Sequence, residues 1–227
     1  MTNIADIRIN KIVRSKRRTL ALEISQDAGL IVRAPAKASL DYIEKIIQQK
    51  RDWILKKQGL ALSRAKRFSP KKFVDGEDFL YLGDTYKLSI GEDCCLPFAF
   101  DGGFRLSRPY IASGRELFTK WYTLKAHTMI QKRLKLYSHV TGLKYTKFSI
   151  SGAKKRWGCC SVNGSLHFTW RLIMAPLKVI DYVVVHELTH IAVKNHSRAF
   201  WTKVSTIMPD YKHAKDWLRH NGFLLSL

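Results

Sequence analysis

The feature that most constrains this chain is a pair of histidines four residues apart, His186 and His190, with Glu187 directly after the first. The surrounding apolar residues have helical spacing, which predicts a helix over about residues 176–194, with Pro176 in its first turn. Residues four apart share one helical face, so both imidazoles can reach one metal ion. Glu187 can then act as general base towards a water on that metal.

A third protein ligand is expected, because catalytic zinc takes three and leaves one position for water. No glutamate follows Glu187 in the sequence. The remaining downstream candidates are His196, Asp210, His213, Asp216 and His220. His196 lies ten residues after His186, the spacing of H-E-x-x-H-x-x-G-x-x-H sites, and is the predicted third ligand of a Zn²⁺ ion. Val193 stands at the glycine position, so we expect the turn at Lys194-Asn195, where asparagine tolerates the left-handed conformation.

Several segments match a known pattern: Val184-Val-His186-Glu-Leu-Thr-His190, Asn195-His196-Ser197, Phe200-Trp201, Pro209-Asp210-Tyr211-Lys212, Trp217-Leu218, Arg156-Trp157-Gly158-Cys159-Cys160, Arg14-Ser15-Lys16-Arg17-Arg18 and Tyr81-Leu82-Gly83. They resemble the YgjP-like metallopeptidase family, which is related to the SprT-like zinc proteases, over about residues 10–222. The resemblance implies a zincin-like fold, with the three histidines as metal ligands and Glu187 as base. Lys155 and Cys159 stand where serines are usual in that family.

Two further residues are candidate substrate-binding groups. Arg156 precedes Trp157-Gly158 on a strand-and-turn segment that can form the edge of a cleft, where a guanidinium can hold a carboxylate, a phosphate or an oxyanion. Tyr211 can donate a hydrogen bond to an oxyanion. A structural ion pair for Arg156 and a core position for Tyr211 are the competing interpretations.

The remaining patterns predict an α+β protein with strands mostly first and helices mostly last. A hairpin is expected from strands at 19–24 and 30–34, and one helix over 40–60 with Leu40, Ile43, Ile46, Ile47, Trp53 and Ile54 as its buried stripe. Short strands follow between 79 and 106, with a hairpin turn at Tyr81–Tyr86. We expect residues 1–110 to form a β-rich basic N-terminal lobe with one helix, and 111–227 to form a zincin-like catalytic core.

The catalytic core is expected to begin with a long helix. Ser113 and Glu116 fit a capping box at its start, and the helix should stop before Gly142. A strand at 147–151, a hairpin through Asn163-Gly164, and helices at 197–207 and 210–221 complete the core.

The charge is unbalanced, since 40 Lys+Arg against 18 Asp+Glu gives a formal net charge of +22. Such a surface attracts polyanions, although a solvated basic surface with no dedicated partner is an equal alternative. No nucleic-acid motif and no Gly-rich phosphate loop accompanies the charge. Nucleotides or nucleic acid are therefore possible partners through charge alone.

Three hypotheses for function remain. The leading one is a zinc metallopeptidase acting on a peptide or protein substrate. The second keeps the metal and makes the chain a nucleoside triphosphate pyrophosphohydrolase. The third is a nucleic-acid-associated protease, whose binding to nucleic acid would weaken steeply with salt.

The chain is expected to be cytoplasmic, with no membrane partner. Residues 1–11 are polar and alternating, without an apolar stretch of signal-peptide length. No run of about 18 apolar residues occurs anywhere. The four cysteines form two adjacent pairs without a C-x-x-C motif, which favours free thiols in a reducing compartment.

Overall fold

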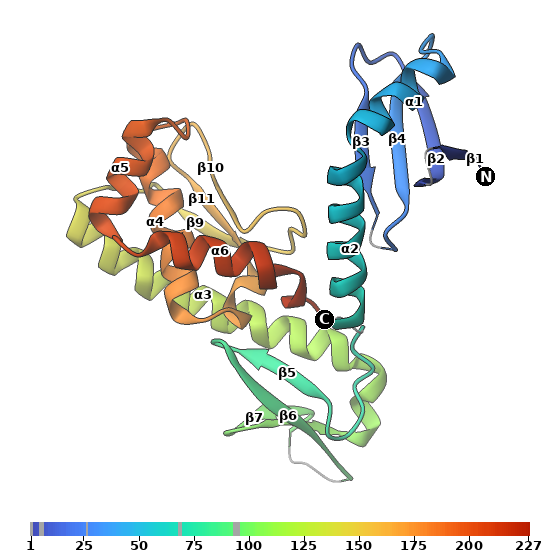
Figure 1. The fold of residues 1–227 in the computed structure, drawn as a ribbon. Coiled ribbons are helices and arrows are strands. Elements are labelled where there is room, and N and C mark those ends of the chain that lie inside the picture. Colours follow the sequence, from blue (N-terminus) through green and yellow to red (C-terminus); the bar gives the residue numbers. More distant parts are fainter. Residues whose placement is uncertain (1, 5–6, 26, 68–69, 93–95) are drawn as a thin grey trace. The chain divides into compact units, whose positions relative to one another are not determined.

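The computed structural model describes residues 2–4, 7–25, 27–67, 70–92 and 96–227 (Figure 1). Cys94 and Cys95 lie outside these residues, whereas Cys159 and Cys160 have free thiols. The chain divides into two compact units, Met1–Ser69 and Pro70–Leu227. This division differs from the expected one at residue 110, because the strands between residues 78 and 107 share a hydrophobic core with the helices that follow them.

The first unit is a four-stranded sheet with two helices. Its elements are β1 (Thr2–Ile4), β2 (Ile7–Ser15), β3 (Ala21–Ile24), β4 (Leu30–Pro35), α1 (Leu40–Gln49) and α2 (Arg51–Arg67). The strand order is β1-β2-β4-β3; β2 and β4 run parallel and the other neighbours antiparallel. The predicted hairpin is confirmed as β3 and β4. Alternate residues of β4 (Leu30, Val32 and Ala34) are fully buried, as in a sheet with one covered face.

The helix predicted over residues 40–60 is two helices, because the backbone leaves the helical region at Lys50, with φ −106° and ψ 12°. Three residues of the predicted stripe are fully buried: Ile43, Ile47 and Ile54. Leu40 and Trp53 are instead exposed to 56% and 42%. Leu40 is the first residue of α1, and Trp53 lies next to the buried Ile54 but on the exposed side of α2.

The second unit mixes helices with two sheets. Its strands are β5 (Asp78–Tyr81), β6 (Asp84–Gly91), β7 (Phe98–Phe100), β8 (Phe104–Ser107), β9 (Phe148–Ser151), β10 (Gly158–Cys160) and β11 (Leu166–Thr169). Its α-helices are α3 (Gly114–Thr141), α4 (Leu177–Ala192), α5 (Arg198–Ile207) and α6 (Tyr211–Asn221). The short 3₁₀ helices are η1 (Arg108–Ser113), η2 (Trp170–Met174) and η3 (Gly222–Leu224). The sheet orders are β5-β6-β8-β7 and β10-β11-β9.

These elements confirm most of the helices and strands that were predicted for residues 111–227. The helices expected at 176–194, 197–207 and 210–221 are α4, α5 and α6, each within two residues at its ends. The hairpin through Asn163-Gly164 joins β10 and β11. None of the helices in the described ranges is both long and apolar enough to span a membrane.

The capping box predicted at Ser113 does not form. Ser113 makes no side-chain capping bond, because η1 leads straight into α3 and its backbone is already near-helical at φ −94°, ψ 4°. Glu116 pairs with Lys120 at 2.8 Å instead of reaching back. The predicted stop is confirmed: Gly142 follows Thr141 in the left-handed conformation, with φ 69°.

The turn between β5 and β6 fixes the start of α4. Leu82 and Gly83 donate backbone hydrogen bonds to the carbonyls of Ile173 and Met174, at 2.9 and 3.1 Å. Gly83 has φ +94°, and a Cβ on it would lie 2.9 Å from Pro176, the residue before α4. Only glycine accommodates both the positive φ and the close approach of Pro176. This turn therefore connects the sheet β5-β6-β8-β7 to the segment that precedes α4.

An ion pair between α3 and α4 is largely buried. Nη2 of Arg133 donates to Oδ2 of Asp181 at 2.7 Å, and Nε donates to Oδ1. The two side chains are only 18% and 9% exposed. A two-pronged arginine–carboxylate contact fixes both distance and orientation, so it locks α4 to the long helix beneath it.

We expect Asp181→Ala to lower the free energy of unfolding by about 3 kcal/mol, because it leaves Arg133 buried without its partner. Asp101 in the exposed pair with Arg105 is 82% exposed and provides the matched control. Asp101→Ala should cost below about 1 kcal/mol. Chemical denaturation of both variants measures the difference, and equal losses would contradict a structural role for the buried pair.

Candidate metal centre

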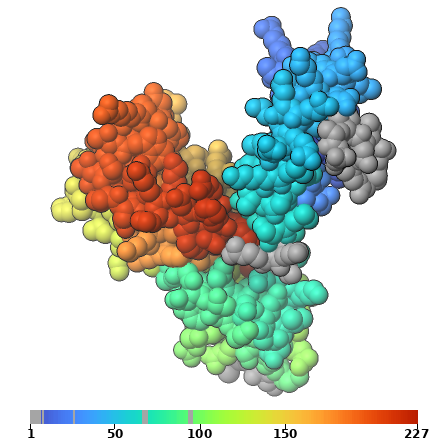
Figure 2. All heavy atoms as spheres, viewed as in Figure 1, coloured from blue at the N-terminus to red at the C-terminus, as the bar shows by residue number. Residues whose placement is uncertain are grey.

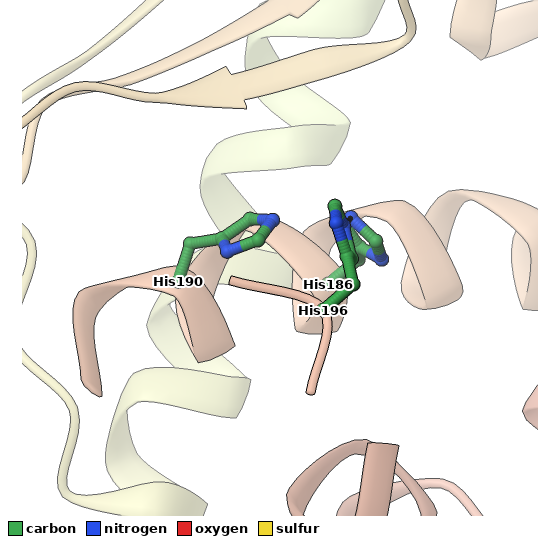
Figure 3. A group of neighbouring side chains, drawn as sticks. All are labelled: His186, His190 and His196. Atoms are coloured by element: carbon green, nitrogen blue, oxygen red, sulfur yellow. Dashed lines mark hydrogen bonds between the residues drawn. The ribbon is translucent and has the colours of Figure 1, made fainter. Parts of the chain in front are cut away.

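The three predicted histidines converge on one point (Figure 3). His186 and His190 project from successive turns of α4, and His196 comes from the loop before α5. One nitrogen from each ring lies within 4.8 Å of the others, and Nε2 of His186 is 3.0 Å from Nε2 of His196. The geometry therefore brings together the set that spacing predicted.

The loop after α4 returns His196 to the helix without a left-handed residue. The helix ends at Ala192, and Val193 is extended, with φ −131° and ψ 107°. Asn195 does not adopt the left-handed conformation expected for it. Its side-chain oxygen instead accepts from the amide of Ser197 at 3.3 Å, so a side-chain hydrogen bond tightens the turn.

His190 is oriented by this same loop. Its Nδ1 lies 3.1 Å from the carbonyl oxygen of Val193. A carbonyl only accepts, so Nδ1 must carry the hydrogen, and Nε2 keeps its lone pair for a metal. Metal-binding histidines are commonly fixed in this way through the second ring nitrogen.

His186 is neutral at physiological pH. Burial, with His190, His196 and Lys215 adding positive charge nearby, lowers the pKa of His186 to about 3. Its Nδ1 is buried and has no hydrogen-bond partner among the described residues. An uncharged imidazole is the form that binds a metal ion, so this site is set for coordination at pH 7.

Aromatic rings support the three imidazoles. Phe200 is fully buried, and its ring centroid lies 4.9, 4.6 and 4.8 Å from those of His186, His190 and His196. Trp201 stacks on His196 at 5.8 Å. Both rings come from the first turn of α5, so packing of that helix holds the His196 loop against α4.

Glu187 lies beside the cluster in a dry environment. It is 5% exposed, and burial raises its pKa from the usual 4.5 to about 7, while Arg156 acts in the opposite direction. Gly158 of β10 packs directly on it: a Cβ there would lie 2.7 Å from both Cγ and Oε1 of Glu187. Only glycine permits this approach of the strand to the carboxylate.

A pocket of about 360 Å³ opens beside His186 and Glu187. The residues that line it come from β10 and its preceding loop, α4 and α6: Trp157, Gly158, Tyr182, Val183, His186, Glu187, Lys215, Leu218 and Arg219. Burial raises the pKa of Tyr182 to about 12, so its hydroxyl stays protonated and remains a hydrogen-bond donor. The pocket thus joins the buried carboxylate to a wall of mixed apolar and cationic character.

The other candidate ligands lie outside the histidine cluster: Asp210, His213, Asp216 and His220. Asp210 is 3.9 Å from Lys178, and Asp216 is 3.3 Å from Arg219. His220 lies one turn beyond Asp216, with Nδ1 2.8 Å from its carbonyl oxygen. Asp210, Asp216 and His220 are thus engaged in contacts within or between α6 and α4.

The two candidate substrate-binding residues do not line the pocket. Arg156 is exposed in the loop before β10, and its charge reaches Glu187. Tyr211 is 9% exposed and stacks on Trp201 at 5.4 Å and on Tyr182 at 6.3 Å. The structure thus places Tyr211 behind the pocket wall.

Sequence reasoning did not single out Tyr182 or Lys215 for the pocket. Tyr182 lies four residues before His186 and therefore shares its helical face. Lys215 lies beside the buried stripe of α6, which is Tyr211, Ala214 and Leu218. Helical spacing could have indicated on which face of its helix each of these two residues lies. It could not indicate which other element of the structure packs against that face.

The donor set fits a borderline transition-metal ion. Three imidazole nitrogens suit zinc, whereas magnesium and calcium prefer oxygen ligands. The backbone carbonyl behind His190 supplies the supporting contact that such sites use. The residues present therefore match a three-histidine site with room beside it for a reacting group.

Comparison with known proteins decides the family. The model of the YgjP-like metallopeptidase domain matches residues 18–221, which is most of the chain. This chain belongs to the YgjP-like metallopeptidase family. The resemblance inferred from the sequence is thus confirmed, and membership of this family implies a hydrolase with a metal ion.

Other comparisons of this YgjP-like protein add little. A search of curated proteins finds no match. Among solved structures, it is similar to a metallopeptidase zymogen, abylysin from Pyrococcus abyssi, with 20% sequence identity and a TM-score of 0.37. The match covers 39% of this chain and 90% of the abylysin chain.

In the metal-free protein, Glu187→Gln should raise stability more at pH 8 than at pH 5. The unfolded chain ionises Glu187 near 4.5, whereas the folded chain keeps it protonated up to about 7. Ionising the buried group at pH 8 therefore costs about 3 kcal/mol, which glutamine avoids, whereas at pH 5 the cost is below about 1 kcal/mol. Denaturation at both pH values in a chelator measures this, and an equal effect at the two would contradict the raised pKa.

Proposed function

We propose that this chain is a zinc-dependent metallopeptidase with a zincin-like core, in which His186, His190 and His196 hold the ion and Glu187 is the general base. The observation that carries the proposal is the convergence of three imidazoles beside a buried carboxylate. The family match over residues 18–221 supports the hydrolase class.

A bound zinc ion supplies a Lewis acid that polarises an amide carbonyl and acidifies a water molecule. Glu187 accepts the proton of the attacking water at a carboxylate oxygen and returns it to the leaving amine. Its pKa near 7 in the metal-free protein suits both transfers, because at neutral pH the protonated and ionised forms of the carboxyl group are about equally populated. Gly158 limits the positions open to this carboxylate.

A peptide substrate fits the surroundings of Glu187. Strand β10 is at the edge of its sheet, in the order β10-β11-β9, and carries Gly158 against the base. An extended peptide can add to an open sheet edge through main-chain hydrogen bonds. Such pairing would hold a peptide bond beside Glu187 and the histidines.

Several finer expectations stay predictions. These are the substrate-binding roles of Arg156 and Tyr211, the identity of the metal as zinc, and the cytoplasmic location. The net charge of +22 is the feature behind the two alternatives, the nucleoside triphosphate pyrophosphohydrolase and the nucleic-acid-associated protease. The family match supports a peptide substrate instead.

Metal content of the purified protein tests the ligand set. We expect one equivalent of zinc in the wild type and in Glu187→Gln, because the glutamate is base and not ligand. His196→Ala should hold much less, since it removes one of three ligands. His220→Ala, a histidine of α6 outside the cluster, is the control and should keep its zinc. Equal zinc in all four proteins would overturn the proposed site.

Gly158→Ala should lower peptide cleavage by about tenfold to a hundredfold while zinc stays bound, because the added methyl displaces the base by a fraction of an ångström or more. Gly152→Ala is the matched control, since a Cβ at Gly152 meets its nearest atom only at 3.9 Å. Cleavage of a peptide mixture and zinc content are measured for both. Unchanged activity in Gly158→Ala would show that the strand does not position Glu187.

A further inference from the structure

The pocket beside Glu187 has a cationic wall that the proposed chemistry does not use. Lys215 and Arg219 lie one turn apart on α6, and both line the pocket. Figure 2 shows α5 and α6, in orange to red, at the surface of the second unit. Both side chains are exposed, so they can meet a substrate that enters from solvent.

Lys215 is held in place by an aromatic ring. Its Nζ lies 4.0 Å from the ring centroid of Trp201, a cation–π contact. Trp201 also stacks on His196, with ring centroids 5.8 Å apart, and on Tyr211, with ring centroids 5.4 Å apart. The ammonium group is therefore anchored to the same aromatic layer that supports the metal ligands.

The positive charge of Lys215 is not balanced within the pocket. No ion pair joins Lys215 to a carboxylate in the parts of the chain that the structure describes, whereas Arg219 lies 3.3 Å from Asp216. Glu187 is the acidic residue of the pocket lining, and it is buried against Gly158. The exposed charges among the residues that line the pocket are therefore those of Lys215 and Arg219, in a chain of net charge +22.

We propose that Lys215 is a specificity-determining residue, which selects peptides that carry a carboxylate close to the bond to be cleaved. The inference rests on the proposed peptidase function, because it assumes a peptide lying along the pocket. A pocket of about 360 Å³ has room for the part of a peptide that carries this carboxylate. In a peptide the carboxylate belongs to an aspartate or glutamate side chain, or to the C-terminus.

Binding to the zinc-loaded Glu187→Gln protein tests the proposal without turnover. Calorimetry compares three short peptides of one sequence: a blocked peptide with a central glutamate, its glutamine twin, and the glutamine peptide with a free C-terminus. The glutamate peptide should bind about threefold to fivefold more tightly than its twin, the size expected of one exposed ion pair. Tighter binding of the third peptide instead would assign the pocket to the C-terminal carboxylate.

Charge variants on α6 locate the effect. Added to the Glu187→Gln protein, Lys215→Met should remove the preference for a carboxylate, and Lys215→Glu should reverse it. Lys212→Glu makes the same charge change on the same helix outside the pocket lining and should leave the preference intact. Zinc content and thermal unfolding confirm that each variant is folded.

The two proposals fail in different ways. Equal binding of all three peptides, no measurable binding of any, or a preference that survives Lys215→Glu would overturn the role of Lys215. Cleavage of a peptide library by the wild type tests the peptidase separately. Cleavage that depends on Glu187 without a carboxylate preference would refute only the specificity, whereas a carboxylate preference in binding without any cleavage would refute only the peptidase.

Discussion

The packing of α4 holds His186, His190 and Glu187 in place. The helix contacts α3, α5, α6 and β10, and Val184, Val185 and Leu188 are fully buried between them. The Arg133–Asp181 pair adds a directional lock, because two parallel hydrogen bonds fix how α4 is rotated on α3. A rotation of α4 would move both histidines and Glu187 together, so the site depends on this core more than on any local contact.

The same burial that anchors α4 also tunes its chemistry. Withdrawal from water disfavours charge, so it lowers the pKa of His186 and raises that of Glu187. In the proposed mechanism, His186 thereby serves as a neutral ligand and Glu187 as a base with a pKa near neutrality. A site of this kind reduces the stability of the metal-free fold, because a buried carboxylate must be ionised without a close partner.

Aromatic rings connect the metal centre to the proposed specificity wall. Phe200 and Trp201 come from one turn of α5 and contact the three histidines, while Trp201 also carries the Lys215 ammonium. Lys215 contacts this ring, and its charge also contributes to the lowered pKa of His186, so the proposed specificity wall is linked to the metal centre in both ways. The proposed role of Lys215 would give the basic character of the chain a specific use at the mouth of the pocket.

The sequence alone determined the parts of the site that depend on local spacing. His186 and His190 share a helical face because they are four residues apart, and the ten-residue step to His196 was enough to name the third member of the cluster. Helix ends were also predictable where one residue decides them, as at Gly142, whose left-handed backbone suits glycine. These features depend on residues within about one to three helical turns along the chain, so they can be predicted directly from the sequence.

Tertiary structure decided the features that depend on contacts between segments far apart in the sequence. Ser113 has the right residue type for a cap, but the 3₁₀ turn before it removes the need. The division between the units lies at Ser69 and Pro70, because β5–β8 pack on the later helices. Gly158 against Glu187, and Lys215 over Trp201, are contacts between segments far apart in sequence. Spacing along the sequence predicts which face of a helix a side chain lies on. Only the packing of the core determines which group from another element contacts that face.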